Sequence, residues 1–157
     1  MEANARYTNA LRSLLVGLSG AGLGVDVVPA GDSRFDSKAV DEFVRIAVLF
    51  EGERPAGRLD EKWNTEVPFT IQADCFARSP AGSDVGAFDR VEQVADTLQD
   101  WLRNRVVLIK DYVGNDTTTT IAYLQLNYPR RLTLPGEDGF ERRTIETPGY
   151  WFLQRGD

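Results

Sequence analysis

The sequence predicts an α+β domain: a mostly antiparallel sheet with two main helices packed on one face and a long hairpin arm. Three observations indicate this fold class. Apolar residues recur with helical spacing in residues 3–18 and 88–104. A clean period-two alternation runs from Val67 to Ala77. The order helix, strands, helix, strands lacks the regular strand–helix alternation of parallel α/β proteins. The 157 residues are the size of one domain, so we expect residues 1–157 to form it.

The first helix is predicted from about Ala3 to Leu18, ending in the glycine-rich stretch SGAGLG. One helical face carries apolar residues: Tyr7, Leu11, Leu14, Leu15 and Leu18. The same stretch resembles a short signal-peptide core, but Glu2 lies where a signal peptide is basic, and no A-x-A-like site follows. We therefore favour the amphipathic helix.

A hairpin with an unusually long connection follows. EFVRIAVLFE is predicted as a central strand, because both of its faces carry apolar residues. The strand from Val67 places apolar side chains at its odd positions, including Cys75. Between them lies GERPAGRLDEKWNTE, which is several times longer than the ~2–5 residues of an ordinary hairpin loop. Connections of this length are usually functional or disordered.

The second half is predicted to begin with a helix from Phe88 to about Asn104, capped by Ser83 or Asp84, with Trp101 on its apolar side. VVLIKDYVGND is read as a strand or as an extension of that helix, and TTTTIAYLQLNYP as a strand. RRLTLPGEDGFER is read as a loop rich in turn residues. RTIETPGYWFLQR is expected to close the chain as a strand or hairpin, bent at Pro148-Gly149.

Composition argues against several function classes. The net charge of −6 disfavours a dedicated nucleic-acid binder, and no apolar run has the ~18 residues of a membrane span. With no histidine there is no Ser-His-Asp triad, Cys-His dyad or imidazole metal site. The single cysteine excludes an internal disulfide. We therefore expect no catalytic residues, no cofactor and no metal.

Individual motifs are explained by structure better than by chemistry. GAGLG follows a helix and does not complete the GxGxxG pattern, so it is read as a helix-ending turn. PGEDGFE lacks the ligand spacing of a calcium loop and is read as a turn. Cys75 is interpreted as a small core residue on a strand, and Arg130 and Arg131 as a solvated turn.

Taken in order, four stretches resemble the tail terminator family of long-tailed bacteriophages, the lambda-like minor tail proteins. They are NARYTNALRSLLVGL, EFVRIAVLFEGE with LDEKWNTEVPFTIQADCFAR, FDRVEQVADTLQDWLRNRV, and TTTTIAYLQLNYP. Together they match the family's opening helix, long hairpin, packed helix and late strand over most of the chain. The segment after Arg130 extends past the shortest family members.

The resemblance implies a structural protein of the virion, at the junction of tail and head and assembled in the host cytoplasm. It implies a homo-oligomeric ring, commonly a hexamer, that caps the tail tube, stops its polymerisation and offers a surface to the head-side connector protein. The genome would pass through the lumen without specific binding, and net negative charge suits that passage. No membrane contact is implied.

The arm is the predicted interface. Its candidate contact residues are Arg54, Arg58, Asp60, Glu61, Lys62 and Trp63. Trp63 is an aromatic in a charged run, which suits an interface anchor, although packing on its own sheet is an equal alternative. Two other functions stay open: another phage neck or head-completion connector protein, and a small-ligand-binding α+β domain or carboxylate enzyme using Asp74 or Glu146.

Overall fold

Eight strands form one sheet in the part of the chain described by the computed structural model, residues 3–32, 34–51, 54–55, 65–79 and 86–153. The elements in chain order are α1 (Ala3–Ser19), β1 (Asp26–Pro29), a 3-10 turn (Ser37–Ala39), β2 (Glu42–Phe50), β3 (Arg54–Pro55), β4 (Thr65–Ala77), α2 (Ala87–Leu102), β5 (Val106–Asp111), β6 (Asp116–Leu126), β7 (Arg130–Thr133) and β8 (Glu141–Leu153). The main strand order is β1-β2-β4-β8-β6-β5, with β3 paired to β4 and β7 to β8. Every pair except β1–β2 is antiparallel. This confirms the α+β class.

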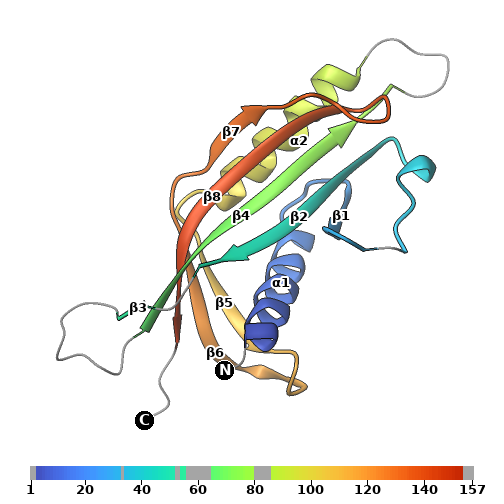
Figure 1. Ribbon diagram of the computed structural model, residues 1–157. Helices are drawn as coiled ribbons and strands as arrows, with labels where there is room; N and C mark the ends of the chain where they lie inside the picture. The colour runs from blue at the N-terminus through green and yellow to red at the C-terminus, as the bar shows by residue number, and fades with distance from the viewer. Residues whose placement is uncertain (1–2, 33, 52–53, 56–64, 80–85, 154–157) are drawn as a thin grey trace.

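The sheet curls around the first helix (Figure 1). Helix α1 contacts β5 at one end of the strand order and both β1 and β2 at the other. Helix α2 lies across β4 and β8. Side chains of both helices belong to one core cluster with the inner face of the sheet, as predicted. Both α-helices thus lie on the inner face, which leaves the outer face without an α-helix in the described part of the chain.

The period-two alternation in the sequence of β4 matches the alternation of buried and less buried side chains along this strand. The odd-numbered side chains from Val67 to Ala77 are buried against the helices. Pro68, Thr70 and Gln72 are only partly covered, whereas Asp74 and Phe76 are buried on the outer face. Phe76 packs there with Phe43 and Phe140, its ring stacked 4.7 Å from that of Phe43. Phe76, an apolar residue at an even position of β4, thus belongs to a second, small aromatic core.

Hydrogen bonds fasten α1 to the β5–β6 hairpin. The Ser13 hydroxyl accepts from the Lys110 backbone N–H at 3.1 Å, and the side-chain Oδ1 of the buried Asn9 accepts from the Val113 backbone N–H at 3.0 Å. Neither of these backbone N–H groups bonds to a neighbouring strand. Because side chains of α1 accept from them instead, the helix can cover this part of the sheet edge. Within β5, these bonds involve only Lys110, in the C-terminal half of the strand.

Helix α2 is fastened by arginines from the sheet. Arg131 on β7 donates to Glu92 at 2.9 Å and to Asp96 at 2.6 Å, and the buried Arg143 on β8 donates to the other Glu92 oxygen. Gln99 also accepts from Arg131 at 2.6 Å. Arg131 was predicted to lie in a solvated turn; instead it is half-buried and joins β7 to the helix.

The C-terminal half departs from the sequence prediction at residues 130–133, which form strand β7 rather than a loop. Of the two forms predicted for the end of the chain, the structure has the strand, and β8 runs through Pro148 and Gly149. Gly149 permits this because a side chain there would meet the Gln125 carbonyl oxygen on β6. Pro148 has no N–H, yet its carbonyl accepts from Asn127 at 2.9 Å. The ambiguous segment after α2 is a strand, β5, and the proposed caps Ser83 and Asp84 lie outside the described residues.

Candidate interaction surfaces

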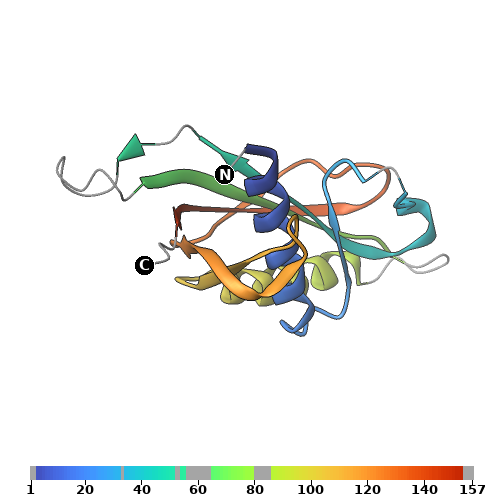
Figure 2. The same cartoon turned by 90° about the horizontal axis from the view of Figure 1, so that it is seen from below.

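The hairpin arm begins as an extension of the sheet. Beyond the last β2–β4 pair, Phe50 with Phe69, the chain pairs again where Arg54 faces Glu66 and Pro55 faces Thr65. This β3 end projects past both helices (Figure 2). Of the predicted contact residues, the described residues include the backbone of Arg54; Arg58, Asp60, Glu61, Lys62 and Trp63 lie outside them.

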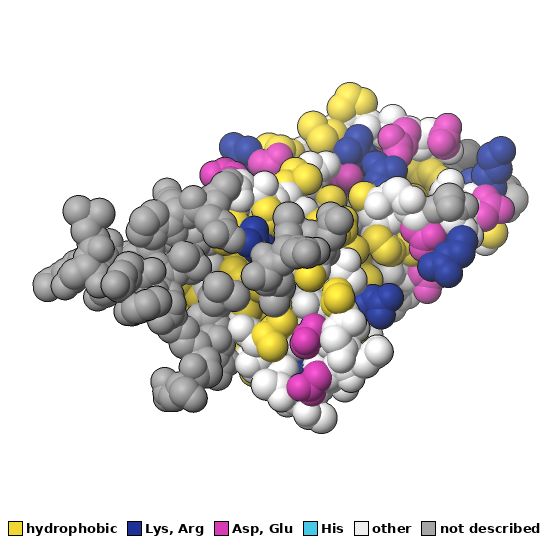
Figure 3. Space-filling view, turned by 60° about the horizontal axis from the view of Figure 1, so that its bottom comes forward, with side chains coloured by type: hydrophobic (Ala, Val, Ile, Leu, Met, Phe, Trp, Pro, Cys, Tyr) yellow, Lys and Arg dark blue, Asp and Glu magenta, His cyan; other side chains and the backbone are white. Residues whose placement is uncertain are grey.

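The outer face of the sheet carries a continuous apolar strip at its arm end. Directly opposed residues on neighbouring strands share a face. Pairing therefore aligns Pro68 with Tyr150, Phe152 with Tyr123, and Tyr123 with Leu108. We call this set the outer strip: Leu49, Pro68, Tyr150, Phe152, Tyr123, Leu108 and Val106. Leu49, Leu108 and Val106 are 53%, 56% and 49% exposed. In Figure 3 hydrophobic side chains lie scattered beside the grey atoms, and charged side chains gather toward the end away from them.

The outer strip ends on an open sheet edge. Among the described residues, no strand lies beyond β5. The Arg105 carbonyl accepts from the Leu126 N–H at 2.8 Å, which makes this a hydrogen-bonded pair. Since such pairs alternate along an antiparallel ladder, the peptide groups of Val106 and Leu108 point away from β6. An added strand would therefore find two N–H donors and two carbonyl acceptors there.

The other edge of the sheet is protected. The Ala30 N–H donates to Ile46 on β2, so the alternation directs the peptide groups of Val27 and Pro29 outward from β1. Proline has no N–H, which leaves this short edge with a single outward donor. The β5 edge is the better template for an incoming strand.

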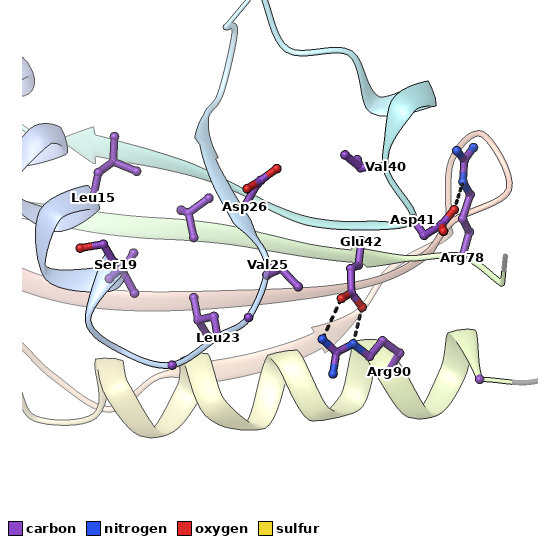
Figure 4. A pocket seen from close by; sticks show the side chains of 15 residues that line it. Leu15, Ser19, Leu23, Val25, Asp26, Val40, Asp41, Glu42, Arg78 and Arg90 are labelled. Carbon is purple, nitrogen blue, oxygen red and sulfur yellow. Dashed lines mark hydrogen bonds and ion pairs between the residues drawn. The ribbon is translucent and has the colours of Figure 1, made fainter.

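A large groove lies beside the start of α2, and Figure 4 shows the side chains that line it. It has a volume of about 1000 Å³ and is bounded by the end of α1, the turn into β1, the start of β2 and the start of α2. Its apolar lining consists of Leu15, Leu18, Leu23, Val25, Val27 and Val40. Pockets for small ligands usually measure about 300–1000 Å³, so this groove is at the large end.

Two ion pairs and one further carboxylate form the polar rim of the groove. Glu42 accepts two hydrogen bonds from the Arg90 guanidinium, one of them 2.7 Å long, and these bonds raise the pKa of Arg90. Asp41 accepts from Arg78 at 3.3 Å. Asp26 is exposed and makes no ion pair with the described residues. The rim thus offers one uncompensated negative charge beside an apolar floor.

Asp74, one of the two carboxylates considered for catalysis, lies within a hydrogen-bonded cluster on the outer face. Its Oδ1 accepts from the Thr144 hydroxyl at 2.5 Å and from Arg142 at 3.0 Å, and its Oδ2 lies 3.5 Å from Arg45. The side chain is almost fully buried by these neighbours. Glu146 instead accepts from the exposed Arg130 at 2.6 Å. The structure does not bring the two carboxylates into one pocket lining.

This arrangement predicts a structural role for Asp74. The Asp74→Ala substitution leaves Thr144 and Arg142 without this acceptor and leaves Arg45 with Glu137 alone, so we expect a loss of about 2–3 kcal/mol in the free energy of unfolding. The Glu146→Ala control removes a surface pair and should cost under about 1 kcal/mol. Urea denaturation measures both. Equal stabilities for the two variants would contradict the assignment.

Cys75 is enclosed by the main core. It has no exposed surface, and burial, reinforced by the charge of Asp74, raises its pKa to about 12. The neutral thiol is therefore both covered and a weak nucleophile near neutral pH. We expect no labelling by a thiol reagent at pH 8 in the native protein and stoichiometric labelling in urea. Rapid native labelling would show that β4 opens locally.

The described residues contain no group of three or more side chains placed to hold a metal ion. Neither described helix has the length and apolar character of a membrane span.

Comparisons with known proteins support the fold alone. No family model matches the sequence, and no curated protein matches it. Several solved structures match, and one of them covers 100% of this chain and 99% of its own, with a TM-score of 0.52 and 11% sequence identity. At that identity the likeness shows a shared architecture. The chain is an α+β domain with a projecting hairpin, an open β5 edge and an apolar outer strip.

Proposed function

We propose that this chain is a structural subunit that assembles with copies of itself into a closed ring, the tail terminator of a long-tailed bacteriophage. The outer strip running into the open β5 edge is the observation that carries the proposal. Contiguous exposed apolar surface marks interaction sites, and an open edge strand invites pairing. The resemblance of the sequence to the tail terminator family supplies the identity of the assembly.

A ring needs a head-to-tail contact, in which the open β5 edge of one copy meets a different surface of the next copy. Such contacts between different surfaces close into a ring when the rotation between copies closes.

Within this proposal the ring caps the tail tube protein and ends its polymerisation. Its other face offers a surface to the head-side connector protein, at the junction of tail and head in the virion. The genome passes through the lumen without specific binding, because fixed negative charge does not trap a moving polyanion.

Native mass spectrometry of the purified chain tests the assembly. We expect one closed oligomer, six copies by resemblance, and the length distribution of tails assembled with and without the protein tests the capping. A protein that stays monomeric at every concentration, including in the presence of tail tubes, would contradict the proposal.

The outer strip gives a sharper test. The Leu108→Glu substitution changes an exposed side chain, so the monomer should keep its circular dichroism spectrum. It places charge on the strip beside the open edge, and we expect at least a tenfold weaker association, on the order of the ~2 kcal/mol typical of an interface hot spot. Tyr128→Glu is the matched control, because Tyr128 is exposed outside the strip. Equal association of both variants would exclude the strip from the interface.

Two other functions have specific tests. A neck or head-completion connector would share the ring but bind the portal side, so purified protein would associate with portal rather than with tail tubes. A small-ligand-binding domain is favoured by the groove of about 1000 Å³. A saturable thermal shift with a small amphipathic ligand, lost when Val40 is replaced by Glu, would support that function.

A further inference from the structure

The arm and the groove lie at opposite ends of β4. The arm begins where Thr65 pairs with Pro55, and the groove is lined by Arg78, the residue after the last residue of β4. A strand of 13 residues spans about 40 Å at ~3.3 Å per residue. The figures agree on this separation, with β3 at one end of the long strands and α2 beginning near the other.

The arm is too short to reach the groove of its own chain. Nine residues, 56–64, connect the paired residues Pro55 and Thr65. A loop that leaves and returns to one place reaches at most half its contour, about 16 Å at ~3.5 Å per residue. This is less than half the length of β4. Any groove that receives the arm therefore belongs to another copy.

The chemistry of the two partners matches. Residues 56–64 read AGRLDEKWN and carry two large apolar side chains, Leu59 and Trp63, each next to charged residues. The groove offers an apolar floor and, on its rim, the carboxylate of Asp26. Lys62 and Arg58 of the arm supply cations for it. Tryptophan in an apolar pocket is a common interface anchor.

We propose that the groove receives residues 56–64 of a second copy, with Trp63 on the apolar floor formed by α1, the turn into β1, β1 and Val40. The inference rests on the ring assembly of the proposed function and names the surface that accepts the arm. Because donor and acceptor are different surfaces, each copy gives one arm and receives one. Repetition of such a contact produces a ring or an open chain, not a two-fold pair.

A disulfide cross-link tests the contact. Val40→Cys places a thiol on the groove and Asn64→Cys places one beside Trp63. Oxidised glutathione is the oxidant, and the native Cys75 is buried. We expect the double variant to give a covalent ladder from dimer to ring size on a non-reducing gel. Each single variant, and the control pair Tyr128→Cys with Asn64→Cys, should give no ladder.

Each outcome of the cross-linking experiment supports or overturns the contact between the arm and the groove. Adding Trp63→Ala to the double variant should slow cross-linking about tenfold or more if Trp63 is the anchor. A fast-migrating monomer with an internal disulfide, a product that stops at dimer, or a ladder equally strong in the control overturns the proposal. If native mass spectrometry shows rings but no ladder forms, the groove assignment fails and the ring stands. If the protein stays monomeric, both fail.

Discussion

Replacing Trp151 with alanine is expected to lower the free energy of unfolding by about 3–5 kcal/mol, the range for a fully buried large aromatic. Trp151 has no exposed surface. On β8 it lies between Val67 on β4 and Leu124 on β6, and its ring meets that of Phe50 edge-on at 5.9 Å. The Trp151 side chain therefore fills the space between β4, β6 and the base of the hairpin at Phe50. Its removal leaves a cavity that these elements cannot fill by moving inward.

Two variants make this result specific. The indole N–H of Trp151 has no hydrogen-bond partner among the described residues, so Trp151→Phe keeps most of the contact and removes an unsatisfied donor. It should cost far less than the alanine change, about 1 kcal/mol. Trp101→Ala should cost about 2 kcal/mol, because Trp101 is only half-buried, against Gly17 and under the Arg105 guanidinium at 4.4 Å. Urea denaturation midpoints with unchanged slopes measure all three. A larger loss for Trp101→Ala than for Trp151→Ala would contradict the burial described here.

Trp101 also shows the limit of what helical periodicity in the sequence can predict. The helical stripe of α2 was predicted correctly, and its buried residues Val91, Ala95, Leu98 and Leu102 follow that spacing. Periodicity places Trp101 on the apolar side, but it does not reveal that the end of the helix meets α1 and solvent together. Trp151 gave no comparable signal, because Pro148 and Gly149 interrupt the alternation of its strand. Their compatibility with a continuous strand depends on Gln125 of β6, a residue remote in the sequence.

The surfaces were harder to predict than the elements. Leu49 was placed correctly on the face opposite Val48, yet its exposure depends on whether anything covers the outer face. The outer strip exists because pairing brings together single residues from five strands, and register is a tertiary property. The groove likewise combines the end of α1 with the start of α2. The arm, in contrast, follows from the number of residues between two strands, which the sequence shows directly.

Shortening the arm is expected to abolish ring assembly while leaving the monomer folded. Because Arg54 and Pro55 pair with Glu66 and Thr65, the deletion should spare them and replace residues 56–64 with an Asn-Gly turn, the pair that suits a two-residue hairpin loop. The change removes no residue of the two described core clusters, so the circular dichroism spectrum and the urea midpoint should stay near those of the parent.

Assembly should respond quite differently. If residues 56–64 fill the groove of the next copy, their loss removes the anchor from every contact of the ring at once. Tails assembled with the shortened chain should lack a uniform length, because nothing caps the tube. Trp63→Ala alone should weaken the same step by about 2 kcal/mol or more, the cost of losing an interface hot spot. Mixing the shortened chain with the parent separates donor from acceptor: the shortened chain keeps its groove and can accept an arm, but it offers none to the next copy. Mixed assemblies should therefore stop as short chains rather than close. Normal rings and uniform tails from a folded, shortened chain would show that the arm is a solvated loop and that the outer strip and β5 edge suffice for assembly.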